Sequence, residues 1–349
     1  MEVTTGYDTM YANQTPTGAT IPSSQTFSAQ TIVQITFFCL FACLIVISNT
    51  LILFVLYKVQ DCFEEMQQFV FRALAVTDLL TGIFCCTLSA FAMIFGTRRS
   101  FSSSLCAVRG AACTGLTNLS ALLITCACFD RFVAIMYPLH YPTMVTLRRA
   151  KFMLVVVCSV AICNGGLSTL RGRTVARSNL CLSDFSSERL AFRPSLVTSL
   201  LILSITLSLT IFFNTKVMLV VFGQSNRVAA ASSVPSGSEQ KTEEGEPKMS
   251  RRRALKGLRP LIVATTSFFV AILPWNIVAA SQFSSSANIA TPMARYVTSA
   301  LLLCNSWMNA LIFATFNRRF RAAAKRVVFP SQSDDSIAET TLYSIDSQK

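Results

Sequence analysis

Seven apolar stretches, each long enough to cross a lipid bilayer as a helix, constrain this chain more than any other feature of its sequence. A bilayer core about 30 Å thick needs roughly 20 consecutive apolar residues in a helix. Only α-helices and closed β-barrels satisfy their own backbone in lipid, and these stretches are too long for barrel strands. We therefore predict an all-α bundle of seven transmembrane helices, at about 31–57, 68–95, 104–136, 150–170, 194–222, 257–281 and 293–315.

Lipid is also the solvent that the composition requires. Hydrophobic residues make up 52% of the sequence and charged residues only 13%, whereas soluble domains carry about 25% charged residues. The formal net charge of +13 could indicate a nucleic-acid-binding protein. However, most Lys and Arg residues lie between alternate apolar stretches, as cytoplasmic loops require. We expect the N-terminus outside the cell and no nucleic-acid partner.

The segments outside the apolar stretches predict the domain organisation. Residues 1–30 are rich in Thr, Ser and Gln, lack the pattern of a cleavable signal peptide, and predict a disordered extracellular tail with a glycosylation acceptor at Asn13. Residues 31–329 are predicted to form the membrane domain, in which 223–256 make a flexible inner loop. The Ser-, Thr- and Asp-rich residues 330–349 predict a disordered cytoplasmic tail.

A short amphipathic segment follows the seventh stretch. Phe316, Phe320, Ala323 and Val327 recur at helical spacing, and basic residues occupy the other side. This pattern predicts a helix that lies on the inner membrane surface. The alternative is a basic tail that is merely solvated.

Short motifs recur in a fixed order along the apolar stretches. They are Ser48-Asn49-Thr50 in the first, Leu74-Ala75-Val76-Thr77-Asp78 in the second, Asp130-Arg131-Phe132 and Tyr137-Pro138-Leu139 after the third, and Asn305-Ser306-Trp307-Met308-Asn309 in the seventh. In order and spacing these motifs resemble the rhodopsin-like (class A) family of G-protein-coupled receptors, over roughly residues 31–329.

This resemblance implies a plasma-membrane receptor that transmits an extracellular ligand signal to heterotrimeric G proteins. It implies receptor kinases and arrestin as further partners, beside membrane lipid. The alternative is a protein of the same fold that does not couple to G proteins, such as a scavenger or a partner of other receptors. We expect no enzyme, because the single histidine, His140, lies in an inner loop and no nucleophile–base pair or metal cluster is evident.

Asp78 is a carboxylate in the middle of an apolar stretch, which costs several kcal/mol unless it is partnered. In the family the matching position holds an allosteric sodium ion, which here would bind Asp78 and Ser120. Oxygen ligands suit such a hard cation. The alternative is a protonated Asp78 hydrogen-bonded to Asn49 and Asn309. No other cofactor is expected. The polar core implied by the resemblance is Asn49, Asp78, Ser120, Asn305, Ser306 and Asn309.

Asp130, Arg131 and Leu139 match the family's G-protein switch. The resemblance implies that Asp130 holds the Arg131 guanidinium in the inactive receptor, and that Arg131 turns toward the G protein in the active one. The alternative is an arginine that only extends its charge to the membrane interface.

Of the 13 cysteines, only Cys106 and Cys181 fall on the outer, oxidising side. They match the cysteines of the family's bridge between the third helix and the second outer loop, so the resemblance implies a disulfide.

The sequence departs from the family at Ala310 and Phe313 in the seventh stretch, at Ile272 before Pro274, and at Ala254, where an acidic residue often tethers the switch arginine. These changes leave the level of basal activity open.

The ligand is not identified by any residue. Cys113 replaces the aspartate of amine receptors, and Leu303 replaces the retinal-binding lysine of opsins. An anionic ligand could pair with outer arginines; alternatively, those arginines pair with nearby acids or lipid headgroups. The candidate ligand contacts are Arg109, Cys113, Trp275 and Arg295.

Overall fold

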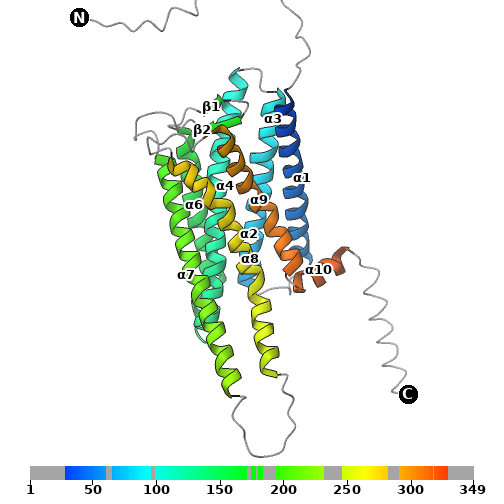
Figure 1. The fold of residues 1–349 in the computed structure, drawn as a ribbon, viewed down its shortest axis with the longest axis vertical. Coiled ribbons are helices and arrows are strands. Elements are labelled where there is room, and N and C mark those ends of the chain that lie inside the picture. The colour runs from blue at the N-terminus through cyan, green and yellow to red at the C-terminus, as the bar shows by residue number, and fades with distance from the viewer. Residues whose placement is uncertain are drawn as a thin grey trace, which may run out of the picture.

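The predicted apolar stretches form the long helices of a bundle in the computed structural model of the protein (Figure 1). The structure describes residues 28–59, 65–95, 99–170, 174–177, 180–183, 194–231, 246–281, 291–316 and 318–328. The helices of the bundle are α1 (Ala29–Lys58), α2 (Glu65–Thr81) continued by η2 (Gly82–Thr87) and α3 (Leu88–Phe95), α4 (Arg99–Met136), α6 (Leu147–Leu170), α7 (Pro194–Ala231), α8 (Glu246–Ala280) and α9 (Pro292–Phe316).

Length and hydropathy allow most of these helices to span a bilayer. Within the described residues, 6 helices are long and apolar enough, from α1 to α8 in chain order. The remaining member of the bundle, α9, has 25 residues, which is about 37 Å at 1.5 Å per residue and exceeds the bilayer core. The predicted seven-helix fold is confirmed.

A small antiparallel sheet at the outer end was not predicted. Strands β1 (Thr174–Arg177) and β2 (Leu180–Ser183) pair so that Ala176 faces Cys181, and both lie against α4. Four residues per strand are too few to give a readable alternation of apolar and polar positions, so the all-α prediction omitted this hairpin.

The inner ends of α7 and α8 extend into the segment that was predicted as a flexible loop. Helix α7 continues to Ala231 and α8 begins at Glu246, so both enter the predicted 223–256 loop. The alanines of α7 and the Arg-rich start of α8 are good helix formers, which a boundary drawn from hydropathy overlooks. Three predicted segments lie wholly or mostly outside the described residues: the rest of that loop, the tail 1–30 with its acceptor Asn13, and the tail 330–349. Of the first tail, only residues 28–30 at the start of α1 are described.

Two close approaches of backbone fix the bundle. A Cβ atom on Gly165 of α6 would lie 2.7 Å from the carbonyl oxygen of Ala111 in α4, so only glycine fits there. The π-helical segment η2 begins at Gly82, where a Cβ atom would lie 2.9 Å from the Ile45 side chain of α1. The sequence analysis did not predict η2.

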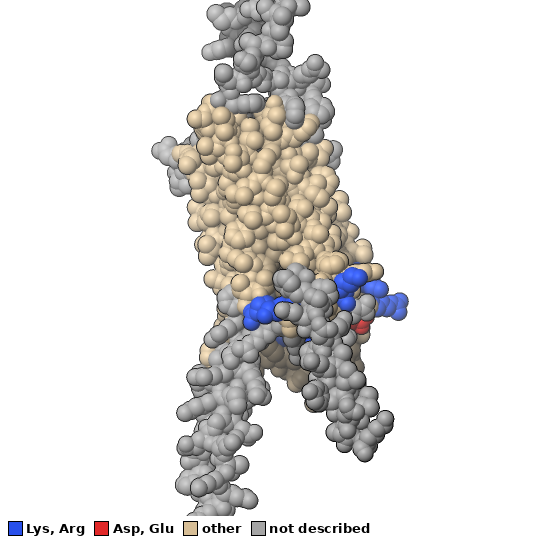
Figure 2. Space-filling view, turned by 90° about the vertical axis from the view of Figure 1, so that its right-hand side faces the viewer, with Lys and Arg blue, Asp and Glu red and all other residues tan. Residues whose placement is uncertain are grey.

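The predicted amphipathic helix is confirmed as α10 (Arg318–Val328), which turns away from the bundle axis at the inner end (Figure 1). Phe320 and Ala323 of α10 are buried against α1 and α9 rather than in lipid. Figure 2 shows Lys and Arg side chains gathered at this end, below a body whose visible described surface is uncharged. This distribution agrees with an inner, cytoplasmic end.

Candidate functional site

A buried carboxylate lies in the polar core of the bundle. Asp78 of α2 is fully buried. Its Oδ1 accepts a hydrogen bond from the Ser120 hydroxyl of α4 at 3.4 Å, and its Oδ2 accepts one from Asn309 Nδ2 of α9 at 3.0 Å. The Ser306 side chain is a further hydrogen-bonding neighbour. Three helices therefore converge on one buried carboxyl group.

The asparagines around this carboxylate retain unused acceptors. Asn49 Nδ2 donates to the backbone carbonyls of Ile45 at 3.0 Å and Ser306 at 3.1 Å, and not to Asp78 among the contacts described. The Oδ1 atoms of Asn49, Asn305 and Asn309 are buried without a hydrogen-bond partner among the described residues. A buried unsatisfied acceptor costs about 1–3 kcal/mol, so this core suits a cation or water that uses these oxygens.

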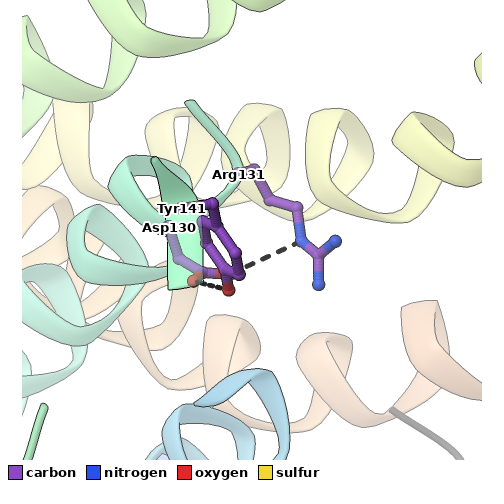
Figure 3. Close-up of polar contacts among 3 residues, drawn as sticks. All are labelled: Asp130, Arg131 and Tyr141. Atoms are coloured by element: carbon purple, nitrogen blue, oxygen red, sulfur yellow. Dashed lines mark hydrogen bonds and ion pairs between the residues drawn. The ribbon is translucent and has the colours of Figure 1, made fainter. Parts of the chain in front are cut away.

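The inner switch consists of two adjacent residues near the end of α4 and one residue of the short helix that follows it. Arg131 Nε lies 3.7 Å from Asp130 Oδ2, with Asp130 almost fully buried (Figure 3). The hydroxyl of Tyr141 in the short helix α5 (Tyr141–Met144) donates to Asp130 Oδ1 at 2.7 Å. The sequence analysis missed Tyr141, because a helix of four residues is too short to show a periodic pattern.

Arg131 is partly shielded from solvent. Its side chain is 24% exposed, and its Nη2 atom is buried without a hydrogen-bond partner among the described residues. Leu139, in contrast, is 90% exposed. The inner end thus combines a covered cation with an uncovered apolar residue. Phe132, the sequence neighbour of Arg131, belongs to a packed cluster whose other members are Ile135, Val217, Val221 and Ile262.

The candidate ligand contacts lie around an apolar cluster in the outer half. Arg109 of α4 is buried, donates through Nε to the Ser89 hydroxyl of α3, and lies 6.0 Å from the Phe38 ring centroid. Cys113 and Tyr296 pack against the cluster that contains Phe38. Arg109 is therefore oriented toward α1 and α3, an orientation that the sequence does not indicate.

The other two candidates lie on α8 and α9. Trp275 and Arg295 are half-buried. Arg295 Nε is buried without a hydrogen-bond partner among the described residues, and its neighbour Tyr296 packs on Phe37 with ring centroids 5.7 Å apart.

The side chains of Cys106 and Cys181 fall outside the described ones. Strand β2, which carries Cys181, lies against α4, which carries Cys106. The backbone arrangement therefore brings the two elements together without describing the bond.

Comparisons with known proteins agree with this arrangement. The model of the family described as "7 transmembrane receptor (rhodopsin family)" matches residues 48–313. The octopamine receptor beta-1R of Drosophila melanogaster is 27% identical over 282 residues, which cover 73% of this chain but only 54% of that receptor, so the chain spans about half its length. Neuropeptide FF receptor 2 of Rattus norvegicus is 24% identical over 306 residues, which cover 82% of this chain and 69% of that receptor.

The same fold occurs in a solved structure. The crystal structure of squid rhodopsin matches with a TM-score of 0.72 and 17% sequence identity, covering 93% of this chain and 95% of that chain. The family match extends over well more than half of the sequence, from the first helix to the seventh. The chain therefore belongs to the rhodopsin-like (class A) family of G-protein-coupled receptors.

Proposed function

We propose that this protein is a plasma-membrane receptor that transmits the binding of an extracellular ligand to a heterotrimeric G protein. The observation that carries this proposal is the inner switch: a shielded Arg131 paired with Asp130, beside an exposed Leu139. Such an arginine is available to a partner only after the inner helix ends separate. Ligand binding would then act by favouring the conformation in which Arg131 is exposed.

The test measures nucleotide exchange on purified G proteins, without ligand, in membranes that contain equal amounts of surface-expressed receptor. Arg131→Ala and Leu139→Ala should each lower basal exchange about tenfold, as expected for loss of an interface anchor worth about 1–2 kcal/mol. Met144→Ala, at an exposed residue of the same inner loop, is the control and should leave exchange unchanged. Equal exchange in all variants and wild type would favour the receptor-fold protein that does not couple.

The ligand is proposed to carry an anionic group on an apolar body. The relatives include receptors named for octopamine and for neuropeptide FF, but an amine needs a carboxylate, and the described outer half of the bundle contains none. It contains Arg109 and Arg295, next to an aromatic cluster. Arginine holds carboxylates bidentately. The competing assignment pairs these arginines with Asp184 or Glu188, which lie outside the described residues.

The polar core fits a monovalent cation. Asp78 supplies one negative charge, Ser120 a hydroxyl oxygen, and three asparagines supply unused carbonyl oxygens, which are the ligands that a hard cation prefers. Asp78 and Ser120 would hold sodium, and the ion would neutralise the buried carboxylate.

Further partners and modifications remain proposals. The Ser and Thr residues of 330–349 are proposed substrates of receptor kinases, because each phosphate adds about −1.5 to −2 charges that a basic arrestin surface can bind. The Cys106–Cys181 disulfide and glycosylation at Asn13 are proposed on the outer side. The contact between β2 and α4 supports the disulfide.

A further inference from the structure

Two hydrogen bonds between side chains join three helices in the inner half of the bundle. The hydroxyls of Thr125 in α4 and Thr210 in α7 lie 3.1 Å apart. One helical turn further along α7, Asn214 Nδ2 donates to the Thr265 hydroxyl of α8 at 3.1 Å. Thr265 is nearly fully buried. In a membrane such bonds carry specific helix association, because lipid offers no competing partner.

The Asn214 bond is the one of this pair that lies nearer to the switch. Cys128 is a further hydrogen-bonding neighbour of the Asn214 side chain, and it precedes Arg131 by less than one turn of α4. On the inner side of Asn214, Val217 packs with residues of α4 and α8. Asn214 thus lies at the junction of α4, α7 and α8, and its neighbour Cys128 is less than one helical turn from Arg131 along α4.

Arg131 lies at the inner junction of α4 with α7 and α8. Its Nη2 atom is buried, and its sequence neighbour Phe132 packs in one cluster with Val217 of α7 and Ile262 of α8. The Asn214–Thr265 bond joins these two helices. It therefore favours the conformation in which Arg131 is covered.

The part of α8 after Glu246 has no acidic side chain that could hold Arg131 in an ion pair. The sequence of α8 contains no Asp or Glu after Glu246, and Ala254 stands where the family resemblance places an acid that tethers the switch arginine. Among the described residues, a hydrogen bond between neutral side chains, from Asn214 to Thr265, can replace such an ion pair.

We propose that Asn214 and Thr265 form a polar latch that holds the inner end of α8 against α7 and keeps Arg131 covered, with the Thr125–Thr210 contact supporting α7. The latch rests on the proposed function only for its signalling consequence. Asn214 and Thr265 are positioning residues, which act on the G protein through Arg131.

The first measurement is independent of any G protein. Hydrogen–deuterium exchange of the purified full-length receptor in nanodiscs reports local opening of helices. Asn214→Leu and Thr265→Val each remove the bond at nearly constant size. Peptides from the inner end of α8 should exchange about threefold to tenfold faster in either variant, as expected for one such bond in a membrane protein. The double variant should show little additional change, because both residues share one contact.

The second measurement is basal nucleotide exchange on G protein, which should rise by a similar factor in both variants. Thr265→Ser retains the hydroxyl and should match wild type. Ser267→Ala is the matched control on the same helix, since its hydroxyl bonds the Ala264 carbonyl of its own helix. If Asn214→Leu does not reach the membrane, the result with Thr265→Val alone decides whether the latch exists.

The outcomes separate the latch from the proposed coupling. Faster amide exchange without faster nucleotide exchange supports the latch and contradicts G-protein coupling. Unchanged amide exchange at the inner end of α8, in variants that fold and reach the membrane, overturns the latch whatever the nucleotide exchange shows.

Discussion

The Asp130 carboxylate takes part in an ion pair with Arg131 and a hydrogen bond from Tyr141, and of these two contacts the sequence predicted the ion pair. Asp130 and Arg131 are adjacent in the sequence, so their pairing needs no knowledge of the fold. The Tyr141 hydroxyl reaches Asp130 from a separate short helix, and nothing in the spacing of a loop reveals such a contact. Arg109 is similar: its bond to Ser89 depends on how the segment after η2 is rotated.

Loss of the Tyr141 hydroxyl should raise basal activity. Tyr141 fixes Oδ1 of Asp130 at 2.7 Å and thereby orients Oδ2 toward Arg131. Removing a hydrogen bond of this kind costs about 0.5–1.5 kcal/mol, which corresponds to a rise of about twofold to tenfold in ligand-free nucleotide exchange with Tyr141→Phe.

Tyr137→Phe provides the control for that experiment. Tyr137 is an exposed tyrosine of the same inner segment, and the described contact of its side chain is the packing of its ring on Phe132. A fall in basal exchange with Tyr141→Phe would show instead that Tyr141 competes with Arg131 for Asp130.

Among the elements, the helices were predictable and their exact mode of contact was not. Apolar length reveals a membrane span, because lipid imposes that length. The π-helical η2 and the β1–β2 hairpin leave no comparable pattern, since both depend on contacts with α1 and α4. Likewise, the adjacent Gly165 and Gly166 are equivalent in the sequence and differ only in what surrounds them.

These two glycines give a matched pair of variants. A Cβ atom at Gly165 meets the Ala111 carbonyl oxygen at 2.7 Å, whereas a Cβ atom at Gly166 meets nothing within 4 Å. Gly165→Ala should therefore lower stability by about 1–3 kcal/mol through overpacking. Gly166→Ala should be neutral or stabilising by up to about 1 kcal/mol, because alanine favours the helix. Thermal unfolding of the purified receptor measures both; equal melting temperatures would show that α4 and α6 can separate at no cost.

At the scale of the whole molecule, the order of spans and motifs predicted the family and the bundle. It did not predict the ligand, because the outer half combines residues from four helices and from segments outside the described ones. The polar core could be predicted as a set of residues, but its unused asparagine oxygens became visible only in three dimensions.

Sodium binding in that core should stabilise the entire bundle. An ion that binds only the folded receptor adds about 1.4 kcal/mol at a concentration tenfold above its Kd, which raises the melting temperature by a few degrees in a protein of this size. Replacing potassium by sodium at constant ionic strength should therefore raise the melting temperature of the wild type. Asp78→Asn, which keeps the size and removes the charge, should abolish the difference. A wild type that responds equally to both ions would leave Asp78 as a hydrogen-bonded structural acid.

Helix α8 is long enough to act as a lever. Proline removes one backbone hydrogen bond and weakens a helix where it lies, so Pro274 and Pro260 bound the stiff segment of α8 that carries Thr265. At 1.5 Å per residue, Thr265 lies about 14 Å from Pro274, and Pro260 lies about 21 Å from it. A displacement of about 1 Å at Thr265, enough to weaken its bond to Asn214, therefore becomes about 1.5 Å at Pro260. A small tilt about Pro274 thus reaches the cytoplasmic side of α8 as a larger movement than the one that weakens the bond.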